Sequence, residues 1–295
     1  MTFAQRVQRL PHLGIGVSTE YGAAGSPGAL DVADLRQKHP EFAGFLEVGL
    51  ETTKGLDGPT RAWRAAGLPT TYHFLDVNLD EPEDFDGPWL EAVRGFVAEL
   101  EPAWLCGDAG LWHFGPRDRG HMLLLPPILT DEVATAMAEG IIRLREETGR
   151  EVLPENPPGH VFLGDLHLLD FFARVCERAD TGLLLDAAHL ALYQRALGHA
   201  PLTGLDAFPL ERVVEVHVAG AGEADVQGLT VLEDDHTPAV LPDTWQILGA
   251  LAPAATELRA VVFECERNAL PACLPGFERI AATLAGSPFA RGSAR

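Results

Sequence analysis

Carboxylate and imidazole side chains recur in this chain, most of them where a short apolar segment ends. The set comprises Glu47, Glu51, His73, Asp108, Glu155, Asp186, His189, His217, Asp234, Asp235, His236 and Glu264, and the amide Asn156 follows Glu155. Such donors suit non-haem iron, manganese, catalytic zinc or magnesium, whereas the lack of thiolates among them disfavours structural zinc and iron–sulfur clusters. The residue types therefore predict metal chemistry, provided that the fold brings them together.

The apolar segments alternate with segments of helical periodicity, and the chain contains eight such pairs. The expected strands are Leu13–Ser18, Gly44–Leu50, Thr70–Leu75, Trp104–Asp108, Glu151–Asn156, Gly182–Ala187, Val213–Ala219 and Ala260–Glu266. The expected helices include Trp89–Leu100, Asp131–Glu147 with Thr130 as N-cap, Asp165–Arg178, Leu190–Leu197, Leu241–Leu251 and Pro271–Ala285. Alternation predicts parallel strands with right-handed crossovers, and eight pairs close into a barrel. We therefore expect a single α/β domain, a (β/α)8 TIM barrel over residues 1–285, with a flexible tail over 286–295.

An open, doubly wound sheet is the alternative arrangement for alternating strands and helices. The glycine-rich segment GVSTEYGAAGSPG at the first expected strand matches neither GxGxxG nor the P-loop spacing. The absence of a phosphate-binding motif at this place favours the barrel.

In a TIM barrel the carboxyl ends of all strands meet at one mouth, so the polar strand ends would converge there. Because side chains alternate along a strand, Glu215 shares a face with His217. Carboxylates packed so closely cannot all stay ionised unless cations lie among them. There are more donors than one ion needs, which predicts two or three ions with Glu155 as a bridge. Glu155, Asp186 and His217 are the expected catalytic residues, because each ends a clear strand.

Each of these residues alone also has an ordinary structural explanation. Asp186 could be a helix N-cap, His217 a core histidine, and Asp234, Asp235 and His236 a solvated acidic loop. Their joint occurrence at seven strand ends is what favours the metal site.

Composition limits the partners and the compartment. The net charge of −21 argues against nucleic acid and anionic lipid, because a field of that sign repels phosphate. The four cysteines form no CxxC pair and are expected to be reduced structural thiols. No apolar run of signal-peptide or membrane-spanning length is present, so we expect a cytoplasmic protein.

Several segments, in their order and spacing, resemble the multinuclear non-haem iron-dependent oxidative enzymes, the family of the methanobactin-maturing oxidase. They are LGIGVS, FLEVGLE, YHFLDVNL, CGDAGLW, LPENPP, LLLDAAHL, EVHVAG, DDHTPAV and FECERN, between about Leu13 and Leu284. The resemblance implies metal roles for His73, Asp108, Glu155, Asp186, His217, Asp235, His236 and Glu264, with His189 as a further ligand and Asn156 near the cluster. From their places in the sequence, Glu47, Glu51 and His113 are also expected around it.

The resemblance also implies a cofactor and a substrate class. The cofactor is a mixed-valent cluster of two or three iron ions that uses dioxygen as co-substrate. The substrate is a cysteine, or a similar residue, in a ribosomally made precursor peptide that a separate leader-recognition protein presents. The iron, the dioxygen, the peptide substrate and the presenting partner are implied by the resemblance alone.

The chain departs from the family pattern at the fourth expected strand. Where the family has a serine–aspartate–histidine run, this chain reads Gly107, Asp108, Ala109, so one histidine ligand is missing. Either His113 reaches back from the loop or one iron site is lost. Two other functions therefore stay open: a divalent-metal hydrolase or sugar isomerase of the xylose-isomerase-like barrels, and a non-catalytic metal-binding scaffold.

Overall fold

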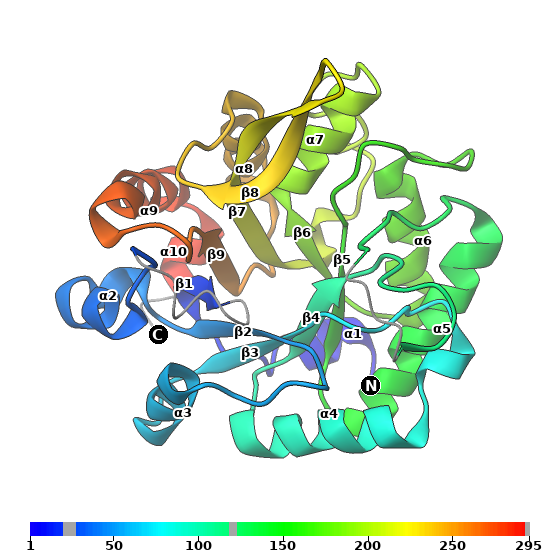
Figure 1. The fold of residues 1–295 in the computed structure, drawn as a ribbon, viewed down its shortest axis with the longest axis horizontal. Coiled ribbons are helices and arrows are strands. Elements are labelled where there is room, and N and C mark those ends of the chain that lie inside the picture. Colours follow the sequence, from blue (N-terminus) through cyan, green and yellow to red (C-terminus); the bar gives the residue numbers. More distant parts are fainter. Residues whose placement is uncertain (20–27, 118–122, 293–295) are drawn as a thin grey trace.

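The computed structural model describes residues 1–19, 28–117 and 123–292 of the chain, and Figure 1 shows their arrangement. Eight parallel strands form the wall of a barrel. They are β1 (Gly14–Thr19), β2 (Leu46–Leu50), β3 (Thr70–Phe74), β4 (Leu105–Asp108), β5 (Val152–Glu155), β6 (Leu183–Asp186), β7 (Val213–Val226) and β9 (Ala260–Glu264). Neighbours pair in the order β6-β5-β4-β3-β2-β1-β9-β7, and pairing of β6 with β7 closes the ring. The predicted (β/α)8 barrel is confirmed.

Helices surround the strands on the outside (Figure 1). They are α2 (Val32–Lys38), α3 (Gly58–Ala65), α4 (Gly87–Leu100), α5 (Asp131–Thr148), α6 (Leu168–Ala179), α7 (Ala187–Ala196), α8 (Pro242–Ala254) and α9 (Leu270–Leu284). Several helices begin at a capping side chain that accepts hydrogen bonds from backbone N–H groups of the first turn. The capping residues are Asp31, Asp57, Asp86 and the predicted cap Thr130. The expected helices overlap the observed ones, with ends that differ by a few residues.

The amino-terminal half of the barrel interior is an apolar plug. Helix α1 (Phe3–Val7) packs Phe3 and Val7 against Phe45, Trp104 and residues of the strand interiors. Arg6 of the same helix pairs with Glu151 at 2.8 Å, which ties the helix to the strand bottoms. Because this end of the barrel is filled with hydrocarbon, the polar strand ends are confined to the opposite mouth.

Strand β7 differs from the prediction, which ended it at Ala219 and placed an acidic loop after it. The strand continues to Val226, turns through Gln227–Gly228, and pairs antiparallel with β8 (Leu229–Thr237). Both turn residues have positive φ, 54° and 86°, the backbone shape that tight hairpin turns require. The three polar residues assigned to the loop therefore lie on a hairpin that rises from the barrel wall beside the mouth.

The carboxyl-terminal segment also differs from the expected flexible tail. Residues Pro288–Gly292 form the short helix α10, and Phe289 is buried with its ring centroid 4.6 Å from that of His12. Burial of this apolar ring holds α10 against the barrel, which the sequence interpretation missed. Residues 293–295 of the expected tail lie outside the described residues. Among the described helices, none is long and apolar enough to cross a membrane.

Two glycines inside helices provide a matched test of how tightly α5 packs on the barrel. A Cβ at Gly140 would overlap the Leu79 carbonyl oxygen, whereas a Cβ at Gly95 of α4 would meet open space. We expect Gly140→Ala to destabilise the protein by about 1–3 kcal/mol through overpacking. Gly95→Ala should stabilise it by about 0.5–1 kcal/mol, since alanine favours helix. Urea denaturation measures both; equal effects of the two substitutions would contradict the packing described here.

Candidate metal centre

The polar strand ends meet in a cavity of about 230 Å³ at the mouth of the barrel. Its lining includes Glu47, His73, Asp108, Glu155, His189, Asp234, His236 and Glu264. These side chains come from β2, β3, β4, β5, α7, β8 and β9, so residues from positions 47 to 264 share one pocket. The predicted convergence of carboxylates and imidazoles is therefore what the structure shows.

Glu155, at the end of β5, occupies the middle of the cluster. Its Oε2 lies 2.7 Å from His73 Nε2, and its Oε1 lies 3.2 Å from His217 Nδ1 and 3.7 Å from His189 Nδ1. The Glu155 side chain is 1% exposed. One buried carboxylate thus faces three imidazoles from three different elements.

A second carboxylate, Asp234 of the hairpin, lies between the imidazole of His189 and that of His236. Its Oδ2 lies 3.1 Å from His189 Nε2 and 3.1 Å from His236 Nε2. The hairpin is positioned for this by an irregular ladder. Ala221 pairs with Asp234 and Gly220 pairs with Thr237, so Asp235 and His236 form a bulge in β8, with His236 in the left-handed region at φ 54°. Asp234 therefore couples α7 to the hairpin across the cavity.

Donor atoms in the mouth fall into three groups, each compact enough to surround a cation. The groups are His73 with Asp108 and Glu155, Glu155 with Asp186 and His189, and Glu47 with His217 and Glu264. Within each group the donor atoms lie within 4.8 Å of one another. Glu155 belongs to two groups, which is the arrangement expected of a carboxylate that bridges two ions.

Many of these donor atoms are buried without a hydrogen-bond partner among the described residues. They are Asp108 Oδ1, Glu155 Oε1, Asp186 Oδ2, Asp234 Oδ1, Glu264 Oε2 and both ring nitrogens of His217. His217 lies 3.0 Å from Glu47 and 3.3 Å from Glu264, yet in neither contact is the geometry that of a hydrogen bond. Unpaired buried polar groups are costly, and cations would satisfy all of them together. The donor set therefore fits a metal centre.

Charges in the cluster shift the protonation of its members. Burial acts to lower the pKa of His73, but the hydrogen bond to Glu155 and the charge of Glu47 raise it to about 9. Burial and the neighbouring charge of Glu155 raise the pKa of Asp108 to about 8. Burial opposes ionisation of Glu155, yet the imidazoles of His217 and His73 hold its pKa below the usual range. Without metal, the site thus holds protons where cations would otherwise bind.

Neighbouring groups fix the orientation of the cluster. The Asn156 amide exchanges hydrogen bonds with the backbone of Asp186 at 2.9 and 3.0 Å, and the Asn156 carbonyl accepts a bond from His189 Nδ1 at 2.9 Å. Glu266 lies 2.7 Å from His236 Nδ1 and accepts a bond from Ser18 at 3.0 Å. Asn156 was expected beside the cluster, but Glu266 was missed. Its place two residues after Glu264 could have indicated it, because residues two apart on a strand lie on the same face.

Asp235 was expected among the metal ligands, but it turns away from the cavity. Its Oδ1 accepts the Thr237 N–H at 3.1 Å, and its carboxylate packs over Gly222. Its neighbour Asp234, which the resemblance had passed over, faces the imidazoles instead because adjacent residues of an extended strand point to opposite sides.

His113 does not replace the missing family histidine. Its Nδ1–H donates to the Gly115 carbonyl at 2.7 Å and its Nε2 lies 3.0 Å from Asp84, so the ring belongs to a separate buried network. Ala109, at the position of that histidine, is buried and offers only its backbone N–H, which bonds Glu155 O at 2.9 Å. Glu51, also expected near the cluster, lies at the rim of the cavity and pairs with Lys54 at 2.8 Å.

A sequence model of the family described as RiPP precursor modification enzyme MbnB/TglH/ChrH matches residues 30–282 of the chain. The chain belongs to this family. The match spans the barrel from before α2 to within α9, and so includes all the donor residues of the three groups together with Asp234 and His236.

The similar curated proteins are called UPF0276 proteins. One from Caulobacter vibrioides is 28% identical over 244 residues, which is 82% of this chain and 83% of that protein. Another, from Anaeromyxobacter sp., is 26% identical over 182 residues, which is 61% of this chain and 62% of that protein. These names describe no activity.

Solved structures with a similar fold are xylose isomerase-like barrels. One, from Mycobacterium smegmatis in complex with magnesium, has a TM-score of 0.56 at 12% identity and covers 95% of this chain and 99% of its own. Endonuclease IV from Thermus thermophilus has a TM-score of 0.54 at 18% identity, with 93% and 99% covered. At such identities the similarity establishes the TIM-barrel fold of this family member and nothing more.

The two adjacent aspartates of β8 offer a matched test of the metal centre. We expect Asp234→Asn to weaken metal binding by at least about tenfold, the scale found for groups that merely orient ligands. Asp235→Asn should leave binding unchanged, because Asp235 faces away from the cavity. Titration of the metal-free protein with Fe²⁺ or Co²⁺ under argon measures both constants. A larger loss in Asp235→Asn than in Asp234→Asn would refute the assignment.

Protonation of the metal-free cluster predicts an unusual pH dependence of stability. His73 has a folded pKa of about 9 against 6.5 when unfolded, so its stabilising contribution is complete below pH 6.5 and disappears as the pH rises through about 9. Asp108, with a pKa raised to about 8, acts in the same direction. The metal-free protein should therefore unfold at lower urea concentration at pH 9 than at pH 6.5, and metal should remove the difference. Equal midpoints for the metal-free protein would show that the cluster is not held protonated.

Proposed function

We propose that this chain oxidises a cysteine, or a similar residue, of a ribosomally made precursor peptide at two or three iron ions held in the barrel mouth. The observation that carries the proposal is the set of three donor groups around Glu155 in a member of the RiPP-modifying family. Imidazole and carboxylate donors without a thiolate suit non-haem iron. Family membership gives the peptide substrate class, and iron and dioxygen are part of the proposal.

The three groups assign the ligands. One ion would be held by His73, Asp108 and Glu155, a second by Glu155, Asp186 and His189, and a third by Glu47, His217 and Glu264. Asp234 and His236 complete the cluster from the hairpin. When bound, iron supplies the one-electron chemistry and the dioxygen activation that protein side chains lack.

The side chains of the chain itself supply orientation and exclusion of water. Asp186 caps α7 by accepting the His189 N–H, which fixes a carboxylate and an imidazole on one rigid turn. Leu75, Trp112 and Leu124 line the cavity beside the cluster, so apolar surface faces the incoming side chain. A cavity of about 230 Å³ suits a single side chain, which fits modification of one residue of a peptide.

Apolar side chains around the mouth support an interaction with a peptide or with its carrier. Leu125, Ile128, Val161 and Leu163 are 42 to 69% exposed and lie on the segments that follow β4 and β5. The Leu129 N–H bonds the Leu163 carbonyl at 2.7 Å, so the two segments are neighbours. Exposed apolar side chains that gather in this way mark interaction sites. We propose that the precursor, presented by a separate leader-recognition protein, is bound over this surface.

The test is turnover of a precursor peptide encoded beside the gene, followed by mass spectrometry. We expect iron-loaded protein with its presenting partner to change the peptide mass only when oxygen is present. Glu155→Gln should abolish the change because it alters two donor groups at once, whereas Glu99→Gln on the outer face of α4 should not.

Undiminished turnover under argon would eliminate the oxidative function. Activity of a colourless, zinc- or magnesium-loaded protein on a sugar would support the isomerase alternative, whose fold this barrel shares.

A further inference from the structure

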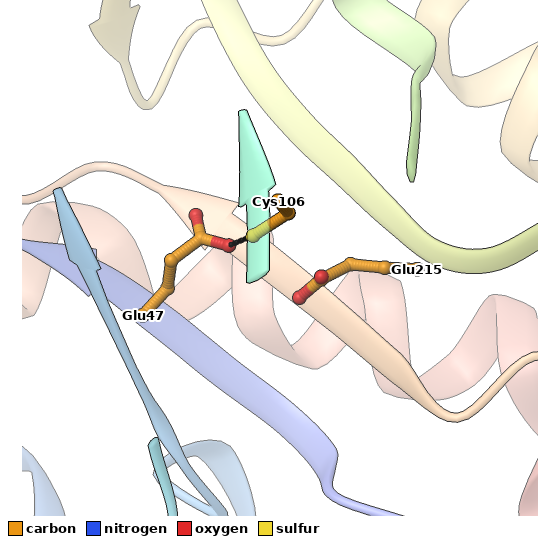
Figure 2. Close-up of side chains that lie close together, drawn as sticks. All are labelled: Glu47, Cys106 and Glu215. Carbon is orange, nitrogen blue, oxygen red and sulfur yellow. Dashed lines mark hydrogen bonds between the residues drawn. The ribbon is translucent and has the colours of Figure 1, made fainter. Parts of the chain in front are cut away.

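Below the mouth, the barrel interior contains a second set of side chains of the kinds that bind metal ions. Figure 2 shows Glu47 of β2, Cys106 of β4 and Glu215 of β7 directed toward one another. Cys106 and Glu215 precede Asp108 and His217 by two residues, so they point inward one layer closer to the apolar plug. All three side chains are buried, at 0 to 1% exposure.

Only some of the polar atoms in this layer have partners. The Cys106 thiol donates to Glu47 Oε2 at 3.1 Å, and Trp104 Nε1 donates to Glu215 Oε2 at 2.6 Å. The other oxygen, Glu215 Oε1, is buried and has no hydrogen-bond partner among the described residues. In Figure 2 the Glu215 carboxylate is turned toward Cys106 and Glu47, and one donor atom of each residue lies within 4.8 Å of the others.

A proton and a cation differ in how well they can stabilise this arrangement. A proton joins two atoms, whereas a cation contacts the sulfur and both carboxylates at the same time. In the part of the chain that the structure describes, neither the ion pair of Glu47 nor the hydrogen bonds of Cys106 and Glu215 involve a lysine or arginine. Two carboxylates buried in this way are costly without a compensating charge.

We propose that Glu47, Cys106 and Glu215 form a separate cation site for a thiophilic divalent ion such as zinc or ferrous iron. A sulfur donor favours such ions over magnesium and calcium, and binding releases the thiol proton to solvent. Glu47 Oε1 lies 3.0 Å from His217 Nε2, so this inner site adjoins the third group of the mouth through Glu47. The ion joins β2, β4 and β7 inside the barrel and holds Glu47 against His217. The inner site does not rest on the peptide-oxidising function.

Cobalt distinguishes this site from the mouth, because thiolate-to-Co²⁺ charge transfer gives a near-ultraviolet band that imidazole and carboxylate ligands do not give. We expect Co²⁺ added to the metal-free, full-length protein under argon to produce the band. Cys106→Ser should abolish it and reduce bound cobalt by one equivalent. Cys176→Ser is the matched control: Cys176 is equally buried, but its thiol contacts Gly182 O at 3.6 Å on the outside of the barrel, so the band should persist.

Glu215→Gln keeps the size of the side chain and an oxygen for Trp104, and it decides the question if Cys106→Ser does not fold. We expect Glu215→Gln to lower the affinity for the cobalt ion that gives the band by at least about tenfold, which is the effect typical of a change in the groups around a metal ion. Absence of the band in folded wild-type protein, or its persistence in Cys106→Ser, would overturn the site. Loss of peptide oxidation with the band intact would count against the proposed function and leave the inner site standing.

Discussion

The structure depends on the concentration of buried negative charge and imidazole in one barrel mouth. Glu47, Glu155, Asp186 and Glu264 are at most 7% exposed, and the partners they face are mainly histidines. Charges of one sign can be buried together only if protons or cations compensate for them. The pKa values of His73 and Asp108 are raised in the cluster, so protons can take this role when no metal is bound. Cations would occupy the same positions as these protons. The same buried charges therefore govern both the folding of the mouth and its binding of metal ions.

The barrel supports this charge by separating its interior into layers. The plug around Trp104 and Phe45 fills the amino-terminal half with hydrocarbon, and the donor atoms begin only above it. Cys106 and Glu215 lie at the boundary between the two, which is why their polar atoms have so few protein partners. The rigid ends of parallel strands then place residues that are far apart in sequence at contact distance. The fold thus gathers the donors of the strand ends at one mouth, and the β7–β8 hairpin adds Asp234 and His236.

Sequence reasoning reached the barrel and most of the cluster because both depend on periodicity. Strand-end residues such as His73, Glu155 and His217 have an inward direction that alternation alone predicts. The hairpin could not be predicted in the same way, because its direction depends on the bulge that Asp235 and His236 form in β8 opposite Gly220 and Ala221. That bulge decides which of Asp234 and Asp235 faces the cavity. Likewise, the contact between Glu266 and His236 depends on tertiary packing, and the helix at the carboxyl terminus depends on a single buried ring, that of Phe289.

The way in which the hairpin delivers its ligands limits how its length can vary in evolution. Asp234 reaches the cavity through a ladder that starts at the Gln227–Gly228 turn, and each step of one residue along that ladder reverses the side on which a side chain lies. A longer turn leaves this ladder in place, whereas one residue added to β8 between the turn and Asp234 would direct Glu233 into the cavity unless a bulge absorbed it. The turn can therefore lengthen to suit different peptides, while the number of residues between the turn and Asp234 is constrained.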